Sequence, residues 1–109
     1  MKRVSNNDFE IILLDGVIDQ DKAIELDALL NELTNEQKYK ILIDMINVKR
    51  ICSGALGVLV ATKRMITDKD GDIKLVITDD SILKIFQTTM LDKVFEIYES
   101  TRECVNIFD

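Results

Sequence analysis

Short apolar runs recur along the chain with the length and spacing of β-strands. Residues 9–14 (FEIILL) and 41–45 (ILIDM) are almost wholly apolar, and the second run has the pattern of a strand covered on both faces. We expect the pair Asp15-Gly16 to end the first run in a turn, because this dipeptide favours turns. Three further strands are predicted: a short edge strand at residues 1–4, and strands at residues 73–77 and 94–98.

Between these runs, apolar residues recur at helical spacing. Residues 22–33 predict an amphipathic helix with Asp19 or Asp21 as its cap, and a second helix follows Ser53. Residues 78–81 offer several caps for a third helix over residues 82–86. The alternation of strands and helices predicts an α/β domain with helices on at least one face of a sheet.

The two ends of the chain add smaller elements. A polar turn is expected at residues 5–8. A terminal helix is expected to begin at Ser100 or Thr101, with Cys104, Val105 and Phe108 on its apolar side.

The amino-acid composition mainly excludes certain classes of partner, catalysis and location. The 109 residues predict one domain over residues 1–109, and the net charge of −6 argues against nucleic acid or an anionic membrane as the main partner. The absence of histidine excludes Ser-His-Asp and Cys-His catalysis and most zinc sites. No apolar run has the length of a spanning helix, and the first residues lack the core of a signal peptide. We therefore expect a cytoplasmic protein without membrane insertion, whose two cysteines, Cys52 and Cys104, are free thiols.

Three aspartates, Asp68, Asp70 and Asp72, have the spacing with which a calcium loop begins. Ile73 stands where such a loop needs glycine, and no glutamate stands at its twelfth position. A polar connector is expected instead, and the sequence predicts no metal site and no cofactor.

The candidate site lies where the apolar strand ends at Cys52-Ser53-Gly54-Ala55 and a helix begins at once. A serine there either caps the helix, which is worth about 1 kcal/mol, or carries a phosphate that the helix dipole tolerates. Gly54 and Gly57 each cost about 1 kcal/mol relative to alanine inside a helix. They therefore indicate a close approach, either by a neighbouring element, which is the simpler explanation, or by a partner.

Four segments together resemble one known family. Residues 41–44 match a strand that ends in aspartate, and residues 52–59 (CSGALGVL) match the motif Asp-Ser-x-Gly-Leu-Gly at a helix start. Residues 15–19 (DGVID) and 90–97 (MLDKVFEI) match two further segments. In this order and spacing, over about residues 9–108, the chain resembles a STAS domain, the fold of anti-sigma factor antagonists.

The resemblance implies a mixed sheet of about four to five strands packed against about four helices. It also implies a non-enzymatic regulator that binds an anti-sigma factor, itself a serine kinase, and so releases a sigma factor. Phosphorylation of Ser53 would end this binding, and a serine phosphatase would restore it. The implied partner-binding residues are Asp19, Lys49, Arg50, Cys52, Ser53, Gly54 and Leu56, while Gly16, Asp44 and Gly57 have turn or structural roles.

The chain departs from the family motif at its centre. Cys52 replaces the aspartate before the phosphorylated serine, Ala55 replaces a glycine, and Lys49 and Arg50 add positive charge just upstream. An alternative hypothesis is therefore a STAS scaffold or transporter accessory module that is never phosphorylated.

Two chemical alternatives also remain. Cys52, beside a helix start and two cations, could be a reactive or redox-sensitive thiol, although a small packed residue is the simpler explanation. Asp19 and Asp44 could form a carboxylate pair for acid–base chemistry, but structural or contact roles are favoured.

Overall fold

Five strands form one mixed sheet in the computed structural model, which describes residues 1–6 and 9–108 and the side chains up to residue 104. Strand β1 pairs antiparallel with β2, and the remaining neighbours are parallel, in the order β1-β2-β3-β4-β5. The strands are β1 (Lys2–Asn6), β2 (Phe9–Ile18), β3 (Lys40–Ile51), β4 (Asp72–Val76) and β5 (Glu96–Tyr98). The predicted turn at residues 5–8 lies partly outside the described residues, as do the side chains of Val105 and Phe108.

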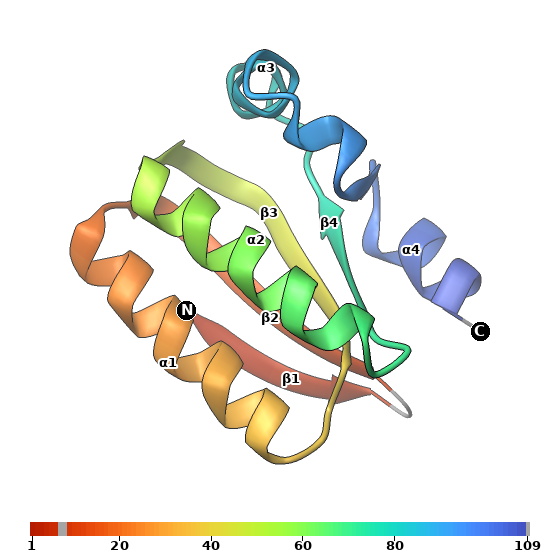
Figure 1. Cartoon of the computed structure of the whole chain (residues 1–109). Coiled ribbons are helices and arrows are strands. Elements are labelled where there is room, and N and C mark those ends of the chain that lie inside the picture. Colours follow the sequence, from red (N-terminus) through yellow and green to blue (C-terminus); the bar gives the residue numbers. More distant parts are fainter. Residues whose placement is uncertain (7–8, 109) are drawn as a thin grey trace.

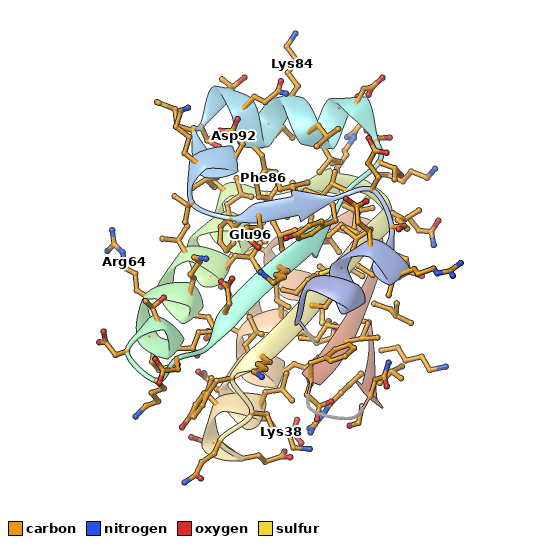
Figure 2. All side chains as sticks on the ribbon, turned by 90° about the vertical axis from the view of Figure 1, so that its right-hand side faces the viewer. Lys38, Arg64, Lys84, Phe86, Asp92 and Glu96 are labelled. Atoms are coloured by element: carbon orange, nitrogen blue, oxygen red, sulfur yellow. The ribbon has the colours of Figure 1, made fainter. Side chains whose placement is uncertain are left out.

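Helices cover both faces of this sheet (Figure 1). Helices α1 (Gln20–Asn35) and α2 (Ser53–Thr67) lie side by side on one face, and α4 (Thr101–Phe108) lies on the other. Helix α3 (Asp80–Thr88) and the 3-10 turn η1 (Leu91–Lys93) lie between β4 and β5 in the chain. Phe86 points from α3 toward the sheet and Lys84 points away from it (Figure 2). The predicted α/β class, with its mixed sheet and four helices, is confirmed.

The alternating side chains of β3 explain why its apolar run has no polar face. Ile41, Ile43 and Met45 are fully buried in the main core beneath α1 and α2. Leu42 points to the opposite face and packs with Val76 and Cys104 under α4. Burying each such side chain contributes about 1.5–3 kcal/mol, so the central strand is held from both sides.

The structure corrects the predicted ends of the two longest strands. Asp15-Gly16 does not end β2, which continues to Ile18, and β3 continues to Ile51 beside it. The pairing register shifts twice, between Leu13 and Asp15 and between Gly16 and Val17, because β3 carries an extra residue at each shift. Gly16 has a φ of +72°, a conformation that favours glycine, so its turn-like signal marks a strand irregularity.

Smaller corrections concern the caps and β5. Asp19 caps α1 and Asp79 caps α3, and each was among the candidates that the sequence offered. The Ser100 hydroxyl accepts a hydrogen bond from the backbone N–H of Glu103 (3.1 Å), and α4 begins at Thr101. Strand β5 begins at Glu96 and not at residue 94, because η1 precedes it.

Candidate functional site

Three helices begin at one edge of the sheet. Strands β2, β3 and β4 are parallel, so their carboxyl ends meet at this edge, where ligands bind in many α/β proteins. Asp19, Cys52 and Asp79 are the residues that immediately precede α1, α2 and α3. The candidate residues predicted from the sequence gather around the first two of these helix starts.

A backbone hydrogen bond joins the first two helix starts. The N–H of Cys52 donates to the carbonyl of Ile18 (2.9 Å), one residue beyond the last pair of the ladder, Ile18 with Ile51. Asp19 therefore lies beside the segment that carries Ser53. The Asp19 carboxylate accepts from the backbone N–H of Lys22 (3.0 Å), and its side chain is exposed.

Ser53 is the first residue of α2, and its side chain is exposed. The cap position belongs to Cys52, whose extended backbone (φ −83°, ψ 162°) is fixed by the bond to Ile18. The interpretation of Ser53 as the helix cap is therefore wrong, because its own backbone is already helical. The position leaves the hydroxyl open to solvent.

The start of α2 differs from the starts of α1 and α3 because it has no carboxylate cap. Asp79 accepts from the N–H groups of Ser81 (2.8 Å) and Ile82 (3.1 Å), whereas Cys52 makes no side-chain cap hydrogen bond. The first turns of α1 and α3 contain Asp21 and Asp80, but the first turn of α2 contains no acidic residue. The positive end of the α2 dipole is thus not offset by a carboxylate at its own cap or in its own first turn.

Exposed cations and an exposed apolar side chain lie near the ends of β2 and β3, shortly before Ser53 in the chain. Lys49 and Arg50 lie on the last residues of β3, both exposed, and neither forms an ion pair with another described residue. Arg50 pairs in register with Val17, whose side chain is 52% exposed. Val17 was not predicted as a site residue, because its strand was expected to end at Gly16. Cys52 is half-buried and packs against the core, as a small residue in place of the motif aspartate would.

The helix residues near Ser53 divide into packed and open positions. A Cβ on Gly54 would lie 2.7 Å from Oε1 of Gln20, so the first turns of α1 and α2 are in close contact there. A Cβ on Gly57 would meet nothing within 4 Å, so packing does not explain this glycine. Leu56 is only 8% exposed and belongs to the core, which corrects its expected place on a contact surface.

Asp44 has a structural role away from this edge. Its carboxylate accepts from the backbone N–H of Ile46 (3.0 Å) and from the Thr101 hydroxyl (3.2 Å), which fastens α4 to β3. Asp19 and Asp44 therefore have separate structural partners, and the structure gives no support to a carboxylate pair between them.

Other features of the described residues lie apart from Ser53. A hollow of about 810 Å³ runs along β5 and α3; it is lined by residues 92–99 and by Lys63, Asp72, Ile77, Leu83 and Gln87, and not by Ser53. Among the described residues, no group of three or more His, Cys, Asp and Glu side chains could hold a metal ion. Within the same part of the chain, no helix is long and apolar enough to span a membrane.

Comparison with known proteins identifies relatives and the family to which the chain belongs. The chain is 22% identical over 101 residues to an anti-sigma-B factor antagonist of Staphylococcus epidermidis, covering 93% of this chain and 94% of the relative. It shares its fold with an anti-sigma factor antagonist of Mycobacterium paratuberculosis (TM-score 0.89, 20% identity, 97% and 90% coverage of the two chains). It is likewise similar to the phosphorylated form of the Bacillus cell fate determinant SpoIIAA (TM-score 0.79, 14% identity, 99% and 98% coverage). The family model of the STAS domain matches residues 2–104, and the chain belongs to the STAS domain family.

Proposed function

We propose that this protein is a non-enzymatic, cytoplasmic regulator that binds an anti-sigma factor and thereby releases a sigma factor. The relatives named as anti-sigma factor antagonists, which match over nearly the full length of both chains, support this role. The observation that carries the proposal is the exposed Ser53 at the start of α2, beside exposed Lys49 and Arg50. This is an accessible hydroxyl on a surface whose cations are not engaged within the described fold.

The proposed contact surface follows the edge at which α1 and α2 begin. It comprises Asp19, Lys49, Arg50, Cys52, Ser53 and Gly54. Leu56 is left out because its side chain is buried. Both signs of charge are exposed here, so the surface suits a protein partner with complementary charges.

Phosphorylation of Ser53 by the anti-sigma factor would switch this contact off. A phosphate adds a charge of about −1.5 to −2 to a surface that the partner must cover. The α2 start tolerates that charge, because its dipole is favourable and no acidic residue in the first turn repels an anion. A serine phosphatase would then restore binding.

Mass spectrometry tests the phosphorylation step directly. The purified protein is incubated with ATP and the anti-sigma factor kinase encoded in the same genome. We expect one phosphate on the wild type and none on Ser53→Ala. Ser81→Ala is the matched control, because Ser81 is an exposed serine in the first turn of α3, and it should be labelled like the wild type. Equal labelling of Ser53→Ala would show that another residue is the acceptor.

A constitutive scaffold or transporter accessory module is the second candidate, and Cys52 in place of the motif aspartate favours it. The discriminating variant is Ser53→Asp, which mimics the charge of the modified serine. Binding of Ser53→Asp as tight as that of the wild type supports the scaffold, whereas a loss of binding supports the switch. A parallel Cys52→Asp variant that is phosphorylated faster than the wild type would show that the cysteine weakens kinase recognition.

A further inference from the structure

Gly57 lowers the stability of α2, and nothing in the described fold requires a glycine at this position. It lies in the second turn of α2, where glycine is about 1 kcal/mol less favourable than alanine. Its φ is not positive, and a Cβ at this position would meet open space. Neither the backbone conformation nor internal packing therefore requires glycine here. A close contact made from outside the molecule would account for a glycine at this position.

The surroundings of Gly57 are apolar and exposed. Ala61 and Met65 follow it at four-residue intervals, so the three residues form one row along α2. Ala61 is exposed and the Met65 side chain is 44% exposed. A row of this kind lets another chain approach the helix backbone closely.

Helix α1 contributes a large apolar side chain to the same surface. Ile24 is 60% exposed and follows Gln20 by one turn, and Gln20 contacts the first turn of α2 at Gly54. Helices α1 and α2 start at the same edge and run side by side (Figure 1), so the turn of α1 that carries Ile24 and the turn of α2 that carries Gly57 both follow the contact between Gln20 and Gly54. We call Ile24, Gly57, Ala61 and Met65 the α1/α2 face.

The charges beside this face favour a basic partner over a second copy of the chain. Asp21 and Asp27 are exposed on α1 and form no ion pair with another described residue. Of the cations on the two helices, Lys22 pairs with Glu25 and Lys63 pairs with Asp72, which leaves Arg64. A second copy docked through its own α1 and α2 would thus offer one unpaired cation for two carboxylates, whereas a helix with several basic residues could pair with both.

We infer that the α1/α2 face receives a helix of the anti-sigma factor, with small or apolar residues against Gly57 and Ile24 and basic residues against Asp21 and Asp27. The inference rests on the proposed function and extends its contact surface beyond the Ser53 edge. It also explains Gly57, since a helix packed closely against α2 leaves no room for a Cβ.

Paired measurements of stability and binding test this inference. Gly57→Ala should raise the melting temperature by about 4 °C or more, because alanine is the better helix former. The same variant should weaken binding to the purified anti-sigma factor about tenfold, because its methyl group separates the two chains. Ile24→Ser should also weaken binding about tenfold, and Asp27→Lys about fivefold. Lys84→Ala is the control, because Lys84 points away from the molecule on α3 (Figure 2), and it should bind like the wild type.

Each outcome decides between the two proposals. If the wild type binds the anti-sigma factor and Gly57→Ala and Ile24→Ser bind equally well, the face is not a contact and only this inference is overturned. If the wild type binds no anti-sigma factor, the proposed function is wrong, and the inference fails with it because it names that protein. If the substitutions reduce self-association instead, the occupant is a second copy of the chain.

Discussion

The edge at which the parallel strands begin and the edge at which they end differ in whether their charged side chains are paired. Where the parallel strands begin, Glu10 is bound by Arg3 and Lys38, and Lys74 is bound by Asp72 and Glu96. Where they end, Lys49 and Arg50 form no such pairs within the described residues. Figure 2 shows these ends apart, with Lys38 at the beginning edge and Lys84 of α3 at the opposite end. At one edge charged pairs hold the fold, and at the other these two cations are left unpaired within the described residues.

The paired edge is also where ionisation is coupled to folding. Burial alone raises the pKa of Glu10, but hydrogen bonds from Lys38, Ser5 and Arg3 outweigh it and lower the pKa below its ordinary value. Burial likewise raises the pKa of Asp72, and the Lys63 and Lys74 ammonium groups lower it overall. The hydrogen bond from Lys74 lowers the pKa of Glu96, with a smaller contribution from Tyr98. Each of these carboxylates is therefore more easily ionised in the folded chain than in the unfolded chain.

Protonation of the paired carboxylates at acid pH should destabilise the fold, and we expect this to be the largest effect on the melting temperature. The ordinary pKa is 4.5 for Glu10 and Glu96 and 3.8 for Asp72, and folding lowers all three. Their stabilisation is complete above these values and is lost as the pH falls through them toward the lower pKa values of the folded state. The melting temperature, followed by circular dichroism, should be level near neutral pH and fall steeply below about pH 4.5.

Glu10→Gln provides the control for the acid experiment. This variant should be less stable at pH 7, because the buried carboxylate that pairs with Arg3 and Lys38 is gone. Its melting temperature should also fall less between pH 6 and 3 than that of the wild type. An identical acid slope in both proteins would mean that Glu10 does not contribute to the coupling.

Asp79→Ala tests whether a carboxylate cap matters at the other edge. The substitution removes hydrogen bonds to Ser81 and Ile82, and we expect a loss of about 1 kcal/mol in the free energy of unfolding. Urea denaturation measures this loss. Asp80→Ala serves as the neighbouring control, since Asp80 is exposed and lies inside the helix, and it should cost less. A loss below about 0.3 kcal/mol for Asp79→Ala would show that the cap is not stabilising.

Cys52→Asp should have the smallest effect and the opposite sign. It gives α2 the carboxylate cap that α1 and α3 have, so the free energy of unfolding should rise by about 0.5–1 kcal/mol. Cys52→Ala, which supplies no cap, is the matched control. A lower stability of Cys52→Asp would indicate that packing of the half-buried cysteine outweighs capping.

The sequence predicted those features that depend on local pattern. The two-sided burial of residues 41–45 followed from their apolar run, and cap preferences limited the caps of α1 and α3 to a few candidates that included Asp19 and Asp79. The continuation of β2 and β3 to residues 18 and 51 could not be predicted in this way. It depends on two register shifts between strands that are about 30 residues apart in the chain, and local composition does not encode such pairing.

The same limit applies to the candidate site. The position of Ser53 at a helix start was correct, but its role as a cap was not, because the hydrogen bond from Cys52 to Ile18 decides which residue stays extended. Leu56 carried the motif signal of a contact residue and turned out to be buried, since it lies on the side of α2 that faces the sheet. Gly57 could be recognised as unexplained only when the space around it was known.

The order of the strands in the sheet has a consequence for how the chain folds during synthesis. Because spatial order follows chain order, every pairing in the described sheet joins strands that are consecutive in the sequence, so each strand can pair with one that has already been made. Asp19, Lys49, Ser53 and the α1/α2 face all belong to elements that end by Thr67. A chain emerging from the ribosome can therefore assemble the proposed contact surface before β4, β5 and α4 have been made. We expect a ribosome-bound nascent chain to protect Ser53 and its neighbours from protease earlier than the α4 segment.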